Sequence, residues 1–126
     1  ATARYGSPML DFTFFFFLNC SERSRKLYRN EYLQIYHCAL STTIPDVQVP
    51  SLDDFKEEFR QKAVYGFLLC SFFKPSMMDP EPFNPYVASR KPVEERAKKS
   101  LSNGGEKATE TIANMLRELI ELKCEL

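Results

Sequence analysis

The single histidine of this 126-residue sequence, His37, is the first residue to consider for acid–base chemistry. Its neighbour Cys38 would complete a nucleophile–base pair only if the two side chains met. Adjacent positions on a helix point about 100° apart, so the sequence does not predict that pair. A catalytic histidine also needs a partner supplied by the fold, and no residue in the sequence stands out for that role. We therefore favour a packing role for His37.

Four acidic residues lie close together at Asp53, Asp54, Glu57 and Glu58. Carboxylates at this spacing can bind a metal ion or share acid–base work. They follow Ser51, however, which is typical of a helix cap, and acids in the first helical turn offset the helix dipole. We favour this structural interpretation.

The cysteines and glycines give no pattern of a metal or phosphate site. The four cysteines are separated by 18, 32 and 54 positions, which matches no zinc pattern of paired Cys-x-x-Cys ligands. Free thiols in a reducing compartment are the simpler interpretation and predict a cytoplasmic protein, with a disulfide as the alternative. The four glycines form no Gly-rich phosphate-binding loop. The cysteines are Cys20, Cys38, Cys70 and Cys124.

Composition argues against two classes of partner. The 17 basic residues balance 17 acidic ones, so we expect no nucleic-acid partner, which would require an excess of positive charge. The longest apolar run, 12–18 with Thr13 inside it, is far shorter than the roughly 20 residues that cross a bilayer, so we expect no membrane span. We expect one helical domain over residues 1–126.

Apolar residues recur at intervals of three and four along most of the chain, which predicts an all-α protein of four or five helices. Ser7 and Pro8 are typical of a helix start, which predicts a first helix over 8–18. This segment is apolar nearly all round, so we expect it to be buried inside something larger; a buried strand is the alternative. Further helices are expected at 22–41, 52–73 and 93–101, and after Gly105.

The prolines between residues 75 and 92 predict a loop or lid. Pro75, Pro80, Pro82, Pro85 and Pro92 interrupt this segment so often that we expect no regular element to continue through it.

A short block near the start of the chain carries a family resemblance. The segment Arg4-Tyr5-Gly6-Ser7-Pro8-Met9-Leu10-Asp11-Phe12, an aromatic run, and then Arg25, Tyr32, Ile35-Tyr36-His37 and Leu40 together resemble the ecdysteroid kinase-like family of arthropods, also described as CHK kinase-like. This family is related to choline kinases and aminoglycoside phosphotransferases within the protein-kinase-like fold. The resemblance implies that the chain is the helical carboxyl-terminal subdomain of such a fold. The helix that contains Gly66 and the closing helix around 115–119 look like later helices of the family.

The resemblance also implies roles for individual residues. The family's aspartate at the position of Asp11 accepts hydrogen bonds from the catalytic-loop backbone and holds that loop in place. The alternative for Asp11 is to serve the helix dipole. In relatives the later helices flank the acceptor site, where a hydroxylated, steroid-like substrate would lie. The apolar candidates for that wall are Tyr36, Phe67, Phe72, Phe73, Met77 and Met78, although core packing explains them equally well.

The resemblance implies a parent enzyme that uses ATP and Mg²⁺ to phosphorylate a hydroxyl group. Phosphoryl transfer needs a cover over the phosphates, a Lys–Glu pair, a catalytic Asp and metal ligands acting together. The sequence shows none of these parts, and by the resemblance it begins just after the metal-binding Asp. We therefore expect a fragment that has no cofactor site, metal site or catalytic residue of its own and that depends on a missing amino-terminal kinase region.

Two rival hypotheses remain open. The first is a non-enzymatic helical protein-interaction module, which would use an apolar face exposed by the loss of the rest of the kinase. The second, favoured only by the Phe-rich segment, is a peripheral membrane or lipid-binding protein. The coding sequence upstream of Ala1 would discriminate among the three hypotheses.

Overall fold

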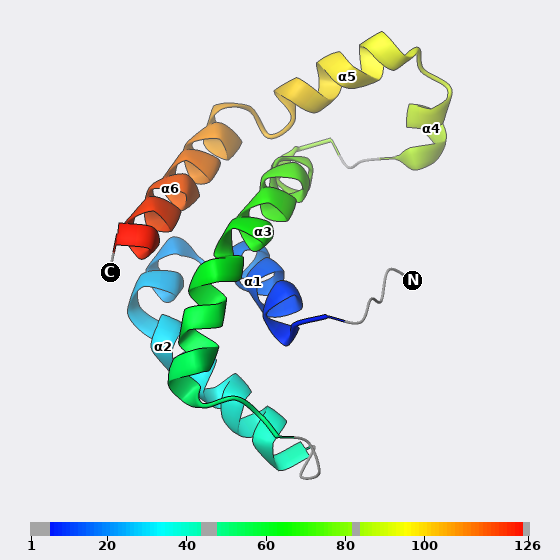
Figure 1. The fold of residues 1–126 in the computed structure, drawn as a ribbon. Coiled ribbons are helices and arrows are strands. Elements are labelled where there is room, and N and C mark those ends of the chain that lie inside the picture. The colour runs from blue at the N-terminus through cyan, green and yellow to red at the C-terminus, as the bar shows by residue number, and fades with distance from the viewer. Residues whose placement is uncertain (1–5, 44–47, 82–83, 125–126) are drawn as a thin grey trace.

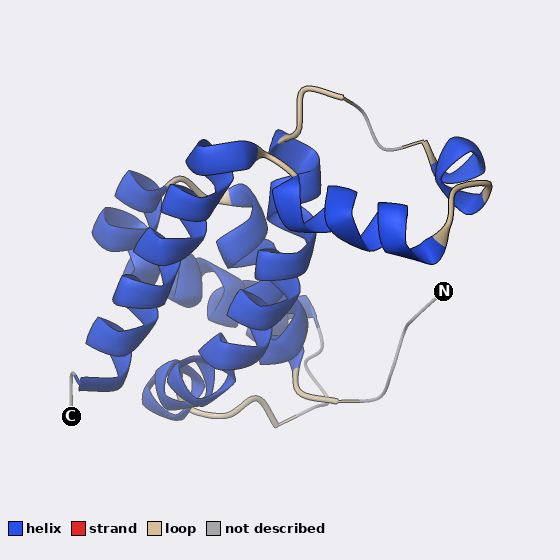
Figure 2. Cartoon of the chain, turned by 90° about the horizontal axis from the view of Figure 1, so that it is seen from above, coloured by secondary structure: helices blue, strands red, loops and turns tan. Residues whose placement is uncertain are grey.

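The computed structural model describes residues 6–43, 48–81 and 84–124 of the chain. These residues form six helices and no strand (Figure 2), so the all-α prediction is confirmed. The sequence predicted at most five helices. The additional one is the five-residue α4, which lies in the segment predicted as a loop. The helices are α1 (Pro8–Asn19), α2 (Glu22–Thr43), α3 (Leu52–Met78), α4 (Pro85–Ser89), α5 (Val93–Ser102) and α6 (Gly105–Cys124).

The long helix α3 is the central element, and α1, α2 and α6 all pack against it (Figure 1). α1 begins as predicted, with Pro8 in its first turn and the Oγ of Ser7 accepting a hydrogen bond from the backbone N–H of Met9 at 3.0 Å. It meets α3 where buried Thr13 lies against Gly66. A Cβ on Gly66 would lie only 2.4 Å from the carbonyl carbon of Thr13. The glycine therefore allows the two helix backbones to approach closely.

The core is largely aromatic and lies around α3. The ring of Phe16 meets that of Phe59 edge-on, with centroids 5.3 Å apart, and Phe17 meets Phe67 in the same way at 6.5 Å. The α3 members recur at the helical spacing predicted from the sequence. The buried hydrophobic residues are Met9, Phe16, Phe17, Leu33, Phe55, Phe59, Ala63, Phe67, Cys70, Ala108, Met115, Leu119 and Leu122.

α3 continues through Pro75 to Met78, so the prediction that this helix ends near residue 73 was wrong. A proline inside a helix removes one backbone hydrogen bond and ordinarily ends the element. Here contacts with the segment that enters α6 support the last turn. The Nδ2 of Asn103 donates to the Oγ of Ser76 at 3.1 Å, and Gly104 packs against the carbonyl oxygen of Pro75. These tertiary contacts offset the local penalty of the proline.

The helices α4 and α5 project beyond the end of α3 as an arm, residues 84–102 (Figure 1). All side chains of α5 are exposed. The carboxylate of Asp79 accepts hydrogen bonds from the backbone N–H of Glu81 at 2.9 Å and of Gly104 at 3.0 Å. The ammonium of Lys99 lies 3.3 Å from the same carboxylate. The carboxylate of Asp79 thus joins the segment that leads into the arm to the segment that follows it.

Asp79→Asn is expected to loosen the base of this arm. The hydrogen bond from the Gly104 N–H is the largest of the influences that hold the pKa of Asp79 below its ordinary value. Because the pKa is lowered by folding, the stabilisation is present at neutral pH and is lost as the pH falls through the lowered pKa. We expect the Gly104 amide to lose hydrogen-exchange protection severalfold in the variant at neutral pH, and the wild type to approach the variant in acid. Equal protection at neutral pH would contradict this role, and Asp53→Asn is the control.

Candidate functional site

An apolar groove of about 470 Å³ lies between α1 and α2. The ring of Phe12 stacks on that of Tyr36 with centroids 5.0 Å apart, and the ring of Phe16 meets that of Tyr32 edge-on at 6.4 Å. These two ring pairs join one helix to the other. The residues that line the groove are Phe12, Phe15, Phe16, Asn19, Cys20, Tyr32, Ile35, Tyr36 and Ala39.

Asp11 lies at the amino-terminal end of this groove. It occupies the first turn of α1, one turn before Phe15, and its side chain is exposed. Among the residues that the structure describes, none forms a hydrogen bond or ion pair with its carboxylate. The charge of Asp11 still reaches Tyr36, whose pKa is raised first by burial and second by this carboxylate. A neutral tyrosine hydroxyl and a solvent-facing carboxylate therefore lie at one end of the groove.

The other residues predicted for a substrate wall lie elsewhere. Phe67 is buried against Phe17 in the core. Met77 is exposed and Met78 half-buried at the far end of α3, whereas Tyr36 packs on Phe55 near its start. At 1.5 Å per residue, that separation along the helix is roughly 30 Å. The structure therefore does not bring Tyr36 and the two methionines to one surface.

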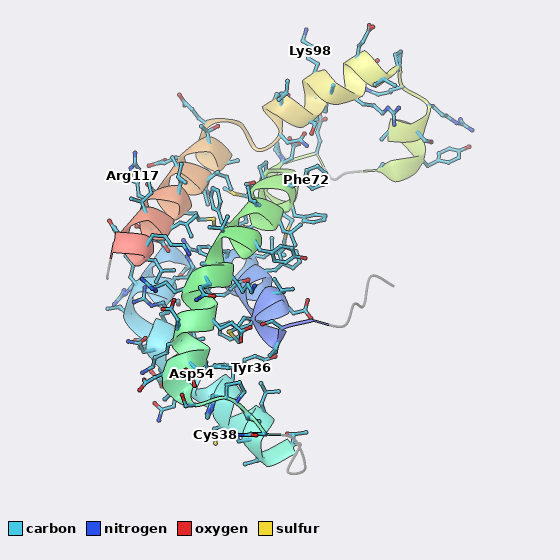
Figure 3. All side chains as sticks on the ribbon, viewed as in Figure 1. Tyr36, Cys38, Asp54, Phe72, Lys98 and Arg117 are labelled. Carbon is cyan, nitrogen blue, oxygen red and sulfur yellow. The ribbon has the colours of Figure 1, made fainter. Side chains whose placement is uncertain are left out.

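The two other aromatic candidates, Phe72 and Phe73, lie on the outer side of α3. Phe72 is 69% exposed and meets Phe73 edge-on, with centroids 5.1 Å apart. Phe73 in turn contacts Phe14 of α1 at 5.7 Å. Figure 3 shows Phe72 and Tyr36 near opposite ends of α3, so these rings also belong to a different surface from the groove.

His37 and the acidic cluster occupy structural positions. The ring of His37 packs edge-on against Phe55 at 5.4 Å, and its Nε2 lies 2.7 Å from the carbonyl oxygen of Pro50. The Oγ of Ser51 accepts a hydrogen bond from the N–H of Asp54 at 3.2 Å, as expected of a helix cap. In the described ranges, no three His, Cys, Asp or Glu side chains come together as a metal site.

The cysteines that the structure describes are free thiols. Cys20 is half-buried, Cys38 is exposed and Cys70 is buried. Burial raises the pKa of the Cys20 and Cys70 thiols, which keeps both in the unreactive protonated form at neutral pH. The side chain of Cys124 lies outside the described residues.

Sequence reasoning missed two features of this region. Arg25, which was identified above only as part of the family resemblance, is buried and pairs with Glu118 of α6. Phe15 and Ile35, which line the groove, are both exposed. The sequence signal available for Phe15 and Ile35 was the width of the apolar face of each helix, which is broader than packing against one neighbouring helix requires.

All the residues named above as lining the groove lie within one continuous stretch of sequence that matches a known protein family. Residues 1–49 match the model of the ecdysteroid kinase-like family. The match covers 49 of the 126 residues and includes α1 and α2. No curated protein and no solved structure matches the chain. Among the residues described, no helix has the length and apolar character needed to cross a membrane.

The ecdysteroid kinase-like match indicates a relative of kinase-like phosphotransferases and supports the resemblance found in the sequence. Of the predicted site residues, Asp11 and Tyr36 lie inside the matched segment, at the same end of the groove. Phe67, Met77 and Met78 lie outside it. The groove end at Asp11 and Tyr36 is therefore the best candidate for a functional site.

Proposed function

We propose that this chain forms the helical, substrate-side part of an ATP-dependent phosphotransferase that acts on a hydroxyl group of a small apolar molecule such as a steroid. The proposal is carried by the position of Asp11 within the ecdysteroid kinase-like match. Its carboxylate is exposed at the start of α1 and has no partner among the described residues, so it is open to the backbone N–H groups of a catalytic loop. In this role Asp11 is a positioning residue and does not touch the reacting atoms.

We assign ATP and Mg²⁺ to the parent reaction, but the side chains that the structure describes do not fit them. Mg²⁺ in such enzymes is held by converging acidic ligands and phosphate oxygens. The described side chains form no such cluster, and the glycines of the sequence form no phosphate-binding loop. We place the nucleotide and the metal ion in an amino-terminal kinase region and expect no phosphate transfer by the chain alone. The free thiols fit a reducing compartment, and we place the protein in the cytoplasm.

Tyr36 is the residue we propose for the wall of the acceptor site, because it lines the groove beside Asp11. Phe67 would support that wall indirectly, since it packs on Phe17 of α1. Met77 and Met78 would contact the substrate only from a separate surface at the end of α3.

A phosphotransfer assay tests the proposal. The 126-residue chain and the protein translated from the complete reading frame are each incubated with Mg²⁺, γ-labelled ATP and a hydroxylated steroid. We expect label transfer by the complete protein and none by the chain. In the complete protein, Asp11→Asn should lower kcat at least tenfold with little change in KM, because loop positioning acts on the chemical step. Asp53→Asn should change neither.

Two outcomes would contradict the proposal. Turnover by the chain alone would show that it carries its own catalytic machinery. Absence of transfer by the complete protein with a panel of hydroxylated steroids would remove the proposed reaction.

A second candidate function, a helical protein-interaction module, is favoured by the outer side of α3. Leu68 and Phe72 are more than half exposed there, and Tyr65 and Phe73 are nearly so. An apolar surface of this kind is typical of a binding face. Lack of phosphotransfer together with an initiator codon close upstream of Ala1 would favour this function.

A further inference from the structure

We propose that the groove between α1 and α2 binds apolar organic cations. The described residues that line the groove come from these two helices and from Cys20 between them. The inference goes beyond the proposed phosphotransfer and does not depend on it. It follows from three properties of the groove: its aromatic lining, the sign of the charge at its rim, and its size.

The lining is rich in aromatic rings from both helices. Phe12 and Phe16 of α1 lie beside Tyr32 and Tyr36 of α2, and all four line the cavity. Phe15 adds a fifth ring, which is 60% exposed and forms no ring contact with any described residue. The face of an aromatic ring carries a negative potential and attracts a cation that lies over it.

The charge near the groove also favours a cation. Among the residues that the structure describes, no lysine or arginine lines it. Asp11 stands one helical turn before Phe15 and close enough to Tyr36 to raise the pKa of that hydroxyl, and no described residue neutralises it. A carboxylate has two oxygens, so one can face a cation while the other accepts a backbone N–H.

Two cationic side chains, Arg25 and Lys74, lie near Cys20 at the opposite end of the groove, and both are already engaged. The guanidinium of Arg25 pairs with Glu118 and donates to the carbonyl oxygen of Cys20 at 2.6 Å. The ammonium of Lys74 donates to the carbonyl oxygen of Leu18 at 2.7 Å. A ligand with a positive head at Asp11 and an apolar body along the rings therefore matches the groove from end to end.

The size sets the ligand class. A cavity of about 470 Å³ is within the range that holds a drug-sized molecule. The fitting ligands are bulky or fused-ring apolar molecules with one ammonium or other organic cation, in contrast to small ammonium ions, which would leave most of the lining uncovered.

Two probes of the same shape and opposite charge test this inference. Tetraphenylphosphonium and tetraphenylborate are each titrated into the 126-residue chain by equilibrium dialysis. We expect the cation to bind at least tenfold more tightly than the anion. Asp11→Asn should weaken the cation about fivefold and leave the anion unchanged or stronger, because it removes only the charge. The measurement needs neither ATP nor turnover, so its failure is distinct from failure of the proposed function.

Matched controls separate the groove from general hydrophobic binding. Phe15→Ala, at an exposed position of the groove, should weaken binding of the cation severalfold, whereas Phe72→Ala, at a similarly exposed position on α3, should not. Asp53→Asn is the control for charge, since its side chain is 94% exposed and does not line the groove. Equal affinity for the two probes, no binding of either, or an equal effect of the two Phe→Ala variants would overturn the inference.

Discussion

Gly66→Ala is expected to lower the free energy of unfolding by about 3 kcal/mol, the upper part of the range for overpacked cores. A Cβ at this position would lie 2.4 Å from the carbonyl carbon of Thr13, 2.6 Å from its oxygen and 2.7 Å from its Cβ. All three atoms are fixed to the backbone of α1, so no rotation of a side chain can relieve the clash. The two helices must separate, which disrupts the packing of the aromatic core around them.

Urea denaturation followed by circular dichroism measures this effect, and Gly6→Ala is the matched control. A Cβ on Gly6 would meet only the Cδ1 of Leu10 at 3.5 Å, which is ordinary van der Waals contact. We expect the control to change stability by less than about 0.5 kcal/mol. If the two alanine variants were equally stable, the close crossing of α1 and α3 would be wrong.

Glu118→Gln is expected to destabilise the protein by about 3 kcal/mol, because it leaves a buried guanidinium without its counter-charge. Arg25 is 3% exposed and Glu118 10%. The Nε and the terminal Nη2 of Arg25 donate to the two carboxylate oxygens at 2.8 and 2.6 Å. The guanidinium also lies 5.7 Å from the centre of the Phe17 ring. The pair thus joins the first turn of α2 to the second half of α6 over the core.

A double variant distinguishes a buried pair from a surface one. Replacing both partners with methionine (R25M and E118M together) should recover most of the lost stability, because apolar residues of similar volume carry no unpaired charge. Glu22→Gln, which breaks the exposed ion pair with Lys26, should have no measurable effect. If Glu118→Gln changed the free energy of unfolding as little as Glu22→Gln does, the buried ion pair would be absent in solution.

Helical periodicity was sufficient to predict most of the fold. The starts of α1, α2 and α3 and the break at Gly104 follow from caps and apolar spacing, which are local signals. The end of α3 could not be predicted locally, because the turn after Pro75 depends on contacts with Asn103 and Gly104. Contacts between residues at least 27 positions apart in the chain thus override the local signal of the proline.

The candidate site was predicted only in part, for a similar physical reason. Asp11 and Tyr36 were identified from a resemblance within a single stretch of sequence, and the structure places them at one end of the groove. Arg25 could not be recognised as buried, because its partner Glu118 lies 93 positions away and an arginine on an amphipathic helix ordinarily faces solvent. Met77 is separated from Tyr36 by the length of α3, which periodicity alone does not reveal.

The coding sequence upstream of Ala1 gives the most direct test of the central claim that this chain is part of a kinase-like phosphotransferase. We predict that the reading frame continues upstream and encodes an amino-terminal lobe. This lobe should contain the Lys of the Lys–Glu pair, a catalytic Asp, and a metal-binding Asp in an Asp-Phe-Gln type motif just before Ala1. A reading frame that begins or stops within a few codons of Ala1 would contradict the claim.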